Sequence, residues 1–100
     1  MSTKLEELLF KIIDSLIASS LTLGESLRVP SMLGTTIEAE TKRLEERAAN
    51  LSHLQKCPGA SEPQIERLFL IADIETRRCI ATLNHAKAVE QAVRKRTEGS

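Results

Sequence analysis

Two long amphipathic helical patterns, separated by a short breaker, constrain this chain more than any other feature. They lie between Thr35 and Arg96, and the breaker is the segment Cys57-Pro58-Gly59-Ala60. Apolar residues recur at intervals of three and four on both sides of the breaker, which places each set on one face of a helix. A connection this short makes consecutive helices antiparallel neighbours. The sequence therefore predicts an all-α fold built on a long antiparallel helical hairpin.

The predicted seam of this hairpin consists of the apolar residues that share these two faces. Before the breaker they are Leu33, Ile37, Leu44, Ala48 and Leu51, and after it Ile65, Leu68, Phe69, Ala72, Thr76, Cys79, Ile80, Leu83, Ala86 and Val93. The later helix has a second apolar face, made of Leu70, Ile71, Ile74, Ala81, Ala88, Val89 and Ala92. A helix that is apolar on two sides is buried on both. The hairpin therefore needs a further element to cover it.

The N-terminal segment supplies a candidate cover. Its apolar residues repeat at helical spacing, and they are Leu5, Leu8, Leu9, Ile12, Ile13, Leu16 and Ile17, with Phe10 widening the stripe. The apolar arc spans roughly 200°, whereas a single packing face needs about 100°. We therefore expect this helix to contact more than one neighbour. With the hairpin it would form a three-helix bundle or a coiled-coil-like structure.

One hundred residues form a single small domain, residues 1–100. We place its helices at about 3–20, 31–56 and 61–96, with a linker at about 21–30. Thr35-Thr36-Ile37-Glu38 and Ser61-Glu62-Pro63-Gln64 match the capping box that begins a helix. In the linker, apolar residues alternate with other residues, which allows an extended segment across the bundle or a short strand. The extended segment is favoured, because a lone strand would have no partner.

The charge distribution argues against a nucleic-acid partner. The chain carries 14 basic and 14 acidic residues, and no segment is strongly basic. Two Phe, with no Trp or Tyr, leave few platforms on which bases could stack. The one local cluster, Arg94-Lys95-Arg96, is typical of a helix C-terminus, where cations interact favourably with the helix dipole. A docking patch is the alternative interpretation of this cluster.

The charged residues of the first helix also indicate where in the cell the protein is located. Glu6, Glu7, Lys11 and Asp14 interrupt its apolar stretch, which argues against a secretory signal and against membrane insertion. We therefore predict a cytoplasmic protein. The two cysteines do not form a disulfide framework, because Cys79 would lie about 24 Å beyond the bend that holds Cys57, against a limit of about 7 Å.

Residues that could carry chemistry do not form a site in this sequence. The metal-ligand candidates are His53, Cys57, Cys79 and His85, but the last two lie several helical turns from the first two, so four ligands do not converge. Cys57 near His53 is the only nucleophile–base pair, and no oxyanion-binding loop accompanies it. No glycine-rich phosphate loop is present. We predict a protein that is not an enzyme, with no cofactor and no metal.

The layout from Ile37 to Lys87 resembles the small co-chaperones of type III secretion needle subunits. Those proteins have a charged helix, a short loop and a helix rich in Gln and Leu. Here Glu62-Pro63-Gln64 is followed by Leu68-Phe69-Leu70-Ile71-Ala72. The resemblance covers about half of the chain, and the N-terminal helix is additional to it. It implies a cytoplasmic adaptor that holds an aggregation-prone partner.

The sequence therefore favours a non-enzymatic helical protein–protein interaction module, an assembly subunit or adaptor that forms a homo- or hetero-oligomer. A small co-chaperone for a secreted or aggregation-prone helical subunit is the alternative, and a coiled-coil oligomerisation module is also compatible. The residues that we expect to bind a partner are Leu8, Phe10, Ile13, Ile17, Leu70, Ile71 and Ile74. Some of them could instead seal the first helix against the third, since bundle helices commonly pack internally.

Overall fold

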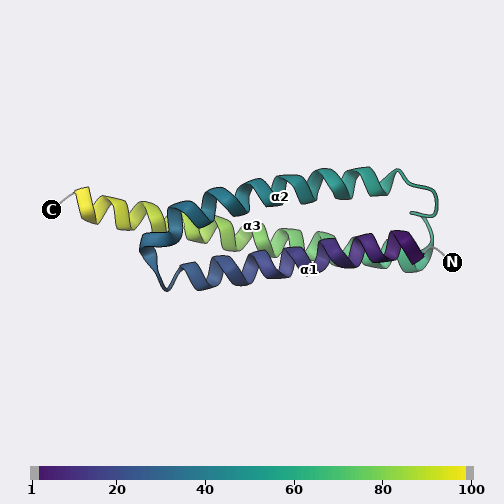
Figure 1. Ribbon diagram of the computed structural model, residues 1–100, viewed down its shortest axis with the longest axis horizontal. Helices are drawn as coiled ribbons and strands as arrows, with labels where there is room; N and C mark the ends of the chain where they lie inside the picture. The colour runs from purple at the N-terminus through teal and green to yellow at the C-terminus, as the bar shows by residue number, and fades with distance from the viewer. Residues whose placement is uncertain (1–2, 99–100) are drawn as a thin grey trace.

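A computed structural model describes residues 3–98, with side chains for residues 4–97, and shows an all-α bundle. Three helices, α1 (Thr3–Ser26), α2 (Leu33–Gln55) and α3 (Pro63–Glu98), account for most of the chain, and a single 3₁₀ turn, η1 (Pro30–Met32), precedes α2 (Figure 1). No strand occurs in this part of the chain. The predicted fold class, a helical hairpin with an additional N-terminal helix, is confirmed.

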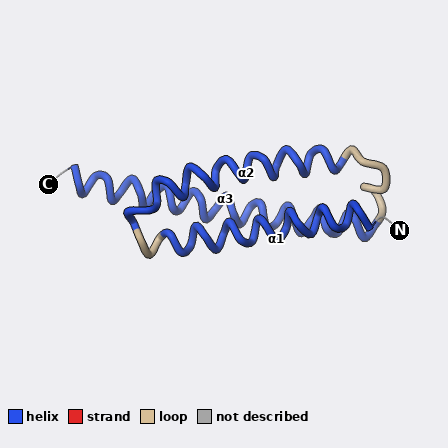
Figure 2. Tube along the Cα trace, viewed as in Figure 1, coloured by secondary structure: helices blue, strands red, loops and turns tan. Residues whose placement is uncertain are grey.

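The bundle is long and narrow, with extents of 60 × 19 × 16 Å. α1 and α3 run in the same direction, and α2 runs antiparallel to both (Figure 1). α3 is the longest helix and packs against both of the others, and its C-terminal end projects past the turn between α1 and α2. Irregular backbone is confined to the two ends of the bundle (Figure 2).

The buried positions of each helix follow a seven-residue repeat. In α1 the buried residues spaced alternately by four and three are Leu5, Leu9, Ile12, Leu16, Ser19, Leu23 and Ser26. In α2 the buried and half-buried residues with this spacing are Leu33, Ile37, Glu40, Leu44, Arg47, Leu51 and Leu54. In α3 the most deeply buried residues, Ile65, Ala72, Cys79 and Ala86, lie seven apart. This spacing is the signature of coiled-coil packing.

The core consists of two apolar clusters, one toward each end of the bundle. Leu5, Leu9, Ile12, Leu16, Leu54 and Ile65 form the first, and Leu23, Leu33, Ile37, Cys79, Leu83 and Ala86 form the second. Leu44 packs against both. Leu51 and Phe69 pack against the first cluster, and Ile37 and Leu83 belong to the second.

The first helix is longer than the sequence predicts. We place its end near residue 20, whereas α1 continues to Ser26 and Leu23 is fully buried. The hydroxyl groups do not interrupt the helix, because Thr22 Oγ1 donates to the Ala18 carbonyl (2.9 Å) and Ser26 Oγ to the Leu23 carbonyl (2.7 Å). Burying a leucine contributes about 1.5–3 kcal/mol, more than the roughly 1 kcal/mol that Gly24 costs in a helix. The predicted extended segment is therefore reduced to the short link between α1 and α2.

Both predicted capping boxes differ from the observed helix starts. α2 begins at Leu33, two residues before Thr35, and no side chain caps it. α3 begins at Pro63, and the Glu62 carbonyl accepts hydrogen bonds from the N–H groups of Ile65 and Glu66. Glu62 rather than Ser61 therefore stands at the N-cap position. The bend itself is as the sequence predicts, since Gly59 has a φ of 87°, a conformation that glycine adopts without strain.

The hairpin seam is narrower than the predicted one. Ala48 and Ile80 are exposed, whereas the residues that follow the seven-residue repeat are buried. A helix flanked by two partners buries the sector that faces both of them. Ala48 and Ile80 lie outside that sector.

Candidate functional site

Large apolar side chains are exposed mainly along α1 and α3. On α1 they are Leu8, Phe10, Ile17 and Leu21, and on α3 they are Leu70, Ile71, Ile74 and Ile80. The two helices are parallel (Figure 1), and the core clusters fix their register, because Leu5 shares one cluster with Ile65 and Leu23 shares the other with Leu83. Each position of α1 therefore lies level with the position about sixty residues later on α3.

Contacts with α2 determine which flank of α1 faces α3. Arg47 of α2 donates a hydrogen bond to Ser15, and Leu8 lines a groove between α1 and α2, so these two α1 residues face α2. Successive residues of a helix are rotated by about 100°, so residues two apart lie on nearly opposite flanks. Phe10 is two residues after Leu8, and Ile17 is two after Ser15. Phe10 and Ile17 therefore occupy the flank of α1 that lies away from α2.

The same reasoning orients α3. Phe69 and Thr76 line a depression that Ala48 and Leu51 of α2 share, so they mark the α2 flank of α3. Ile71 is two residues from Phe69, and Ile74 is two from Thr76, so both lie on the side of α3 away from that flank. We refer to six of the exposed apolar residues on the outer surfaces of these two helices as the α1–α3 face. Its members are Phe10, Ile17, Leu21, Leu70, Ile71 and Ile74.

Five of the seven predicted partner-binding residues belong to this face, namely Phe10, Ile17, Leu70, Ile71 and Ile74. Ile13 is buried, with 7% of its surface exposed, so it lies within the bundle itself. Leu8 is exposed but lies on the opposite flank of α1. Leu21, 64% exposed, is a member that was not predicted, because the sequence predicts a linker at residue 21. Its spacing of four from Ile17 is the signal that would have found it.

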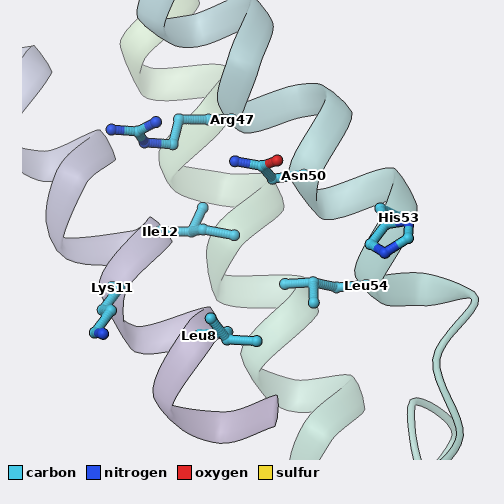
Figure 3. A pocket seen from close by; sticks show the side chains of 7 residues that line it. All are labelled: Leu8, Lys11, Ile12, Arg47, Asn50, His53 and Leu54. Carbon is cyan, nitrogen blue, oxygen red and sulfur yellow. The ribbon is translucent and has the colours of Figure 1, made fainter. Parts of the chain in front are cut away.

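A groove between α1 and α2 is the second surface with the character of a site. It encloses about 400 Å³ and is lined by Leu8, Lys11 and Ile12 of α1 and by Arg47, Asn50, His53 and Leu54 of α2 (Figure 3). Ile12 and Leu54 are buried and form an apolar floor. Lys11, Arg47, Asn50 and His53 supply polar groups around it. Arg47 Nε donates to Ser15 Oγ over 2.8 Å, which joins the two helices beside the groove.

A buried polar layer around Glu40 adjoins the second core cluster, to which Cys79 belongs. Glu40 is only 1% exposed, its Oε1 accepts a hydrogen bond from Arg43 Nη1, and its Oε2 is buried without a hydrogen-bond partner. Burial raises the pKa of the nearby Cys79 thiol; interaction with the Ser20 hydroxyl lowers it, and the Glu40 carboxylate raises it. The Ser20 hydroxyl makes no hydrogen bond of standard geometry. Cys79 is therefore a protonated, inert thiol at neutral pH.

The candidate catalytic and metal-binding residues do not converge. The Cys57 thiol points toward the His53 backbone carbonyl (3.7 Å). Cys79 is buried while His85 is exposed, and both cysteines are free. Among the residues that the structure describes, no group of three or more His, Cys, Asp or Glu side chains is placed to hold a metal ion.

Comparison with known proteins adds no family to this description. No protein-family model matches the chain, and neither the curated proteins nor the solved structures include a significant match. Within residues 3–98, none of the helices combines the length and the apolar character needed to cross a membrane.

Proposed function

We propose that this protein is a non-enzymatic helical interaction module, an assembly subunit or adaptor that contacts another protein chain through the α1–α3 face. The observation that carries the proposal is the exposure of six large apolar side chains along two adjacent parallel helices. Each of them is between 40% and 64% exposed. Single exposed leucines are ordinary, whereas several large apolar side chains exposed on two adjacent helices support an interaction surface.

The size of the face supports this proposal. One large apolar or aromatic side chain has a surface of about 150–250 Å², so six half-exposed ones present on the order of 500 Å². A standard protein–protein interface buries about 800 Å² on each partner, and its centre is more apolar than its rim. The α1–α3 face has the size expected for such a centre.

Charged residues flank the face in the way that an interface rim requires. Arg77 pairs with Asp73 (3.2 Å), and Arg78 pairs with Glu75 (3.5 Å), on the stretch of α3 around Ile74. These pairs satisfy their own charges, so a partner that covers them does not bury an unpaired ion at these positions. Ion pairs in such a solvent-accessible rim contribute more to specificity than to affinity.

A co-chaperone role is the more specific form of the same proposal. α1 and α3 are parallel and present apolar side chains at matching levels, as Phe10 and Ile71 do. A partner's amphipathic helix could pack along such a pair as an additional helix of the bundle. This agrees with the cytoplasmic adaptor that the sequence resemblance implies. Suppression of the partner's aggregation by the purified protein would distinguish a co-chaperone from a permanent assembly subunit.

Single charged substitutions test the proposal. Phe10→Asp and Ile74→Asp should abolish association, because they place an unpaired carboxylate in the apolar centre of the interface. Both residues are about half exposed, so the variants should keep helical circular dichroism and a cooperative melt. Light scattering of the purified protein, and its co-purification with a partner identified by mass spectrometry, measure association.

Ile13→Asp is the matched control, because it introduces the same charge three residues from Phe10 at a buried position. It should unfold the bundle. If Phe10→Asp and Ile74→Asp keep wild-type association, the α1–α3 face is not the contact surface. If they unfold the protein as Ile13→Asp does, the face is part of the core.

A further inference from the structure

We propose that the groove between α1 and α2 binds an aliphatic monocarboxylate, a small ligand with a medium-length hydrocarbon chain and one anionic head. The groove lies on the α2 flank of α1, away from the α1–α3 face, so the proposal is independent of the proposed function. Its volume of about 400 Å³ falls in the range of small-molecule sites, roughly 300–1,000 Å³.

The floor of the groove suits a hydrocarbon chain. Ile12 and Leu54 close its base, and both are buried members of the first core cluster. Leu8 forms a partly exposed apolar wall on the α1 side. A chain lying on this floor would cover the apolar surface that Leu8 exposes to water. Because the floor belongs to the packed core, the groove exists before any ligand binds.

The rim of the groove suits an anion. Lys11 and Arg47 bring two positive charges to it, Asn50 adds an amide donor, and no acidic residue lines it. Lys11 takes part in none of the ion pairs found in the described part of the chain. The nearest carboxylate to the Arg47 guanidinium is Glu46, at 3.9 Å, and it is largely exposed. A carboxylate beside Arg47 would therefore not compete with an anion inside the groove, and Lys11 would add positive charge to the rim.

Ser15 holds the guanidinium in place. Arg47 Nε donates to Ser15 Oγ at 2.8 Å, so one edge of the group is committed to α1 and the Nη atoms remain for a ligand. A guanidinium fixed in this way loses little conformational freedom when it binds a carboxylate. The head of the ligand belongs at this end of the groove, beside Arg47.

The same hydrogen bond argues for a short ligand with one head. It joins α1 to α2 where the groove begins, so a peptide segment or helix could not run through that end. From Arg47 to Leu54 the α2 wall is seven residues long, about 10 Å at about 1.5 Å per residue. Figure 3 shows Arg47 and Leu54 at the two ends of this wall, with Asn50 between them. That length accommodates a medium-length chain that starts at the guanidinium.

Titration with sodium octanoate, followed by nuclear magnetic resonance of the backbone amides, tests the proposal. We expect saturable shifts confined to residues 8–12 and 47–54. Octanol has the chain without the charge and octyltrimethylammonium reverses the charge, so both should bind about tenfold more weakly or not at all. Arg47→Gln should weaken octanoate binding about tenfold, and Lys11→Gln about threefold.

Two control variants isolate the charge from the fold. Lys42→Gln removes a lysine from the outer surface of α2 and should leave octanoate affinity unchanged. Ser15→Ala removes the same hydrogen bond as Arg47→Gln but keeps the guanidinium, so it should weaken binding less. Circular dichroism checks that every variant remains helical.

Any of five outcomes would overturn the proposal, and the first four concern octanoate and its analogues. They are the absence of saturable shifts at about 10 mM octanoate, octanol binding as tight as that of octanoate, shifts centred on the α1–α3 face, and equal losses from Ser15→Ala and Arg47→Gln. Tighter binding of N-acetyl-leucyl-leucine than of octanoate would also reject it, and would assign the groove to the C-terminus of a protein chain.

Discussion

Arg47 and Ser15, thirty-two positions apart in the sequence, are joined by a hydrogen bond of 2.8 Å from Nε to Oγ. Arg47 occupies a place in the seven-residue repeat of α2 that Leu44 and Leu51 fill on either side of it. Apolar residues are the rule at such places, and a polar one there specifies how the helices align. This bond therefore aligns α2 with α1. It also places Ser15 on the flank of α1 that faces α2.

Ser15→Ala should lower the free energy of unfolding by about 1 kcal/mol, because it removes a partly buried hydrogen bond between two helices. Urea unfolding followed by circular dichroism measures this loss. Thr22→Ala is the matched control, since the Thr22 hydroxyl donates to a carbonyl of its own helix on an exposed surface, and it should change stability by about 0.5 kcal/mol or less. Equal losses from the two substitutions would show that the bond between helices contributes nothing specific.

Glu40 should be a position where the native residue costs stability. It is 1% exposed, and one carboxylate oxygen has no hydrogen-bond partner. Glu40→Leu should raise the free energy of unfolding by about 1–3 kcal/mol, because an apolar side chain of similar size replaces a desolvated charge. Arg43→Ala should act in the opposite direction by about 1–3 kcal/mol, since it leaves the carboxylate without its ion pair.

Denaturant unfolding shows whether each substitution raises or lowers the free energy of unfolding. Light scattering of the same samples measures the oligomeric state. A buried polar residue in a coiled coil can maintain one register or oligomeric state at a cost in stability. If Glu40→Leu destabilises the bundle as much as Arg43→Ala does, the carboxylate makes favourable contacts that outweigh its desolvation, and this interpretation of the polar layer is wrong.

Cys79 should give the bundle a pH-dependent stability in the alkaline range. Burial, the largest cause, raises the pKa of its thiol above the ordinary value of 9.0. The native state therefore keeps this proton at pH values where the unfolded state has lost it. The stabilisation is complete below about pH 9 and decreases as the pH rises toward the higher native pKa.

Urea unfolding between about pH 7 and pH 10.5 measures this dependence. Cys79→Ala removes the titrating group while the other ionisable residues stay the same, so its stability should fall less steeply over this range. Parallel pH profiles for the two proteins would contradict the assignment. Cys57 is only half-buried, so a thiol reagent should modify it in the folded protein while Cys79 remains protected.

The hairpin could be predicted from the sequence because its signals are long and periodic. α2 and α3 together contain nearly sixty residues, and the breaker at Pro58 and Gly59 leaves one plausible connection. The end of α1 could not be predicted, since Ser19, Ser20, Thr22, Gly24 and Ser26 are all weak helix formers. Burial of Leu23 against α2 and α3 stabilises this segment, and that contribution depends on the assembled bundle rather than on local propensity.

The candidate surfaces were accessible to sequence analysis only in part. Helical spacing identifies the apolar residues that a single hairpin seam would not bury. Five of the seven that were predicted to bind a partner belong to the α1–α3 face. It does not say which flank of α1 meets α2, because that depends on the contact between Arg47 and Ser15. Leu8 and Phe10 therefore look equivalent in the sequence but lie on opposite flanks. The groove was missed for the same reason, since its walls lie about forty residues apart in the chain.

Leu21 and Leu23 should respond very differently to the same substitution. Both lie in the segment where the sequence predicts a linker, yet Leu21 is 64% exposed and Leu23 is fully buried. Leu23→Ala should cost about 2–5 kcal/mol of unfolding free energy, because it leaves a cavity in the second core cluster. Leu21→Ala should cost about 0.5 kcal/mol or less, because its side chain faces solvent. Urea unfolding of the two variants provides the comparison.

An extended linker that lies across the bundle would give the two leucines similar costs, since residues two apart in an extended segment share one face. Similar costs would therefore contradict the continuous helix, and a larger cost for Leu21 would reverse the assignment of its face.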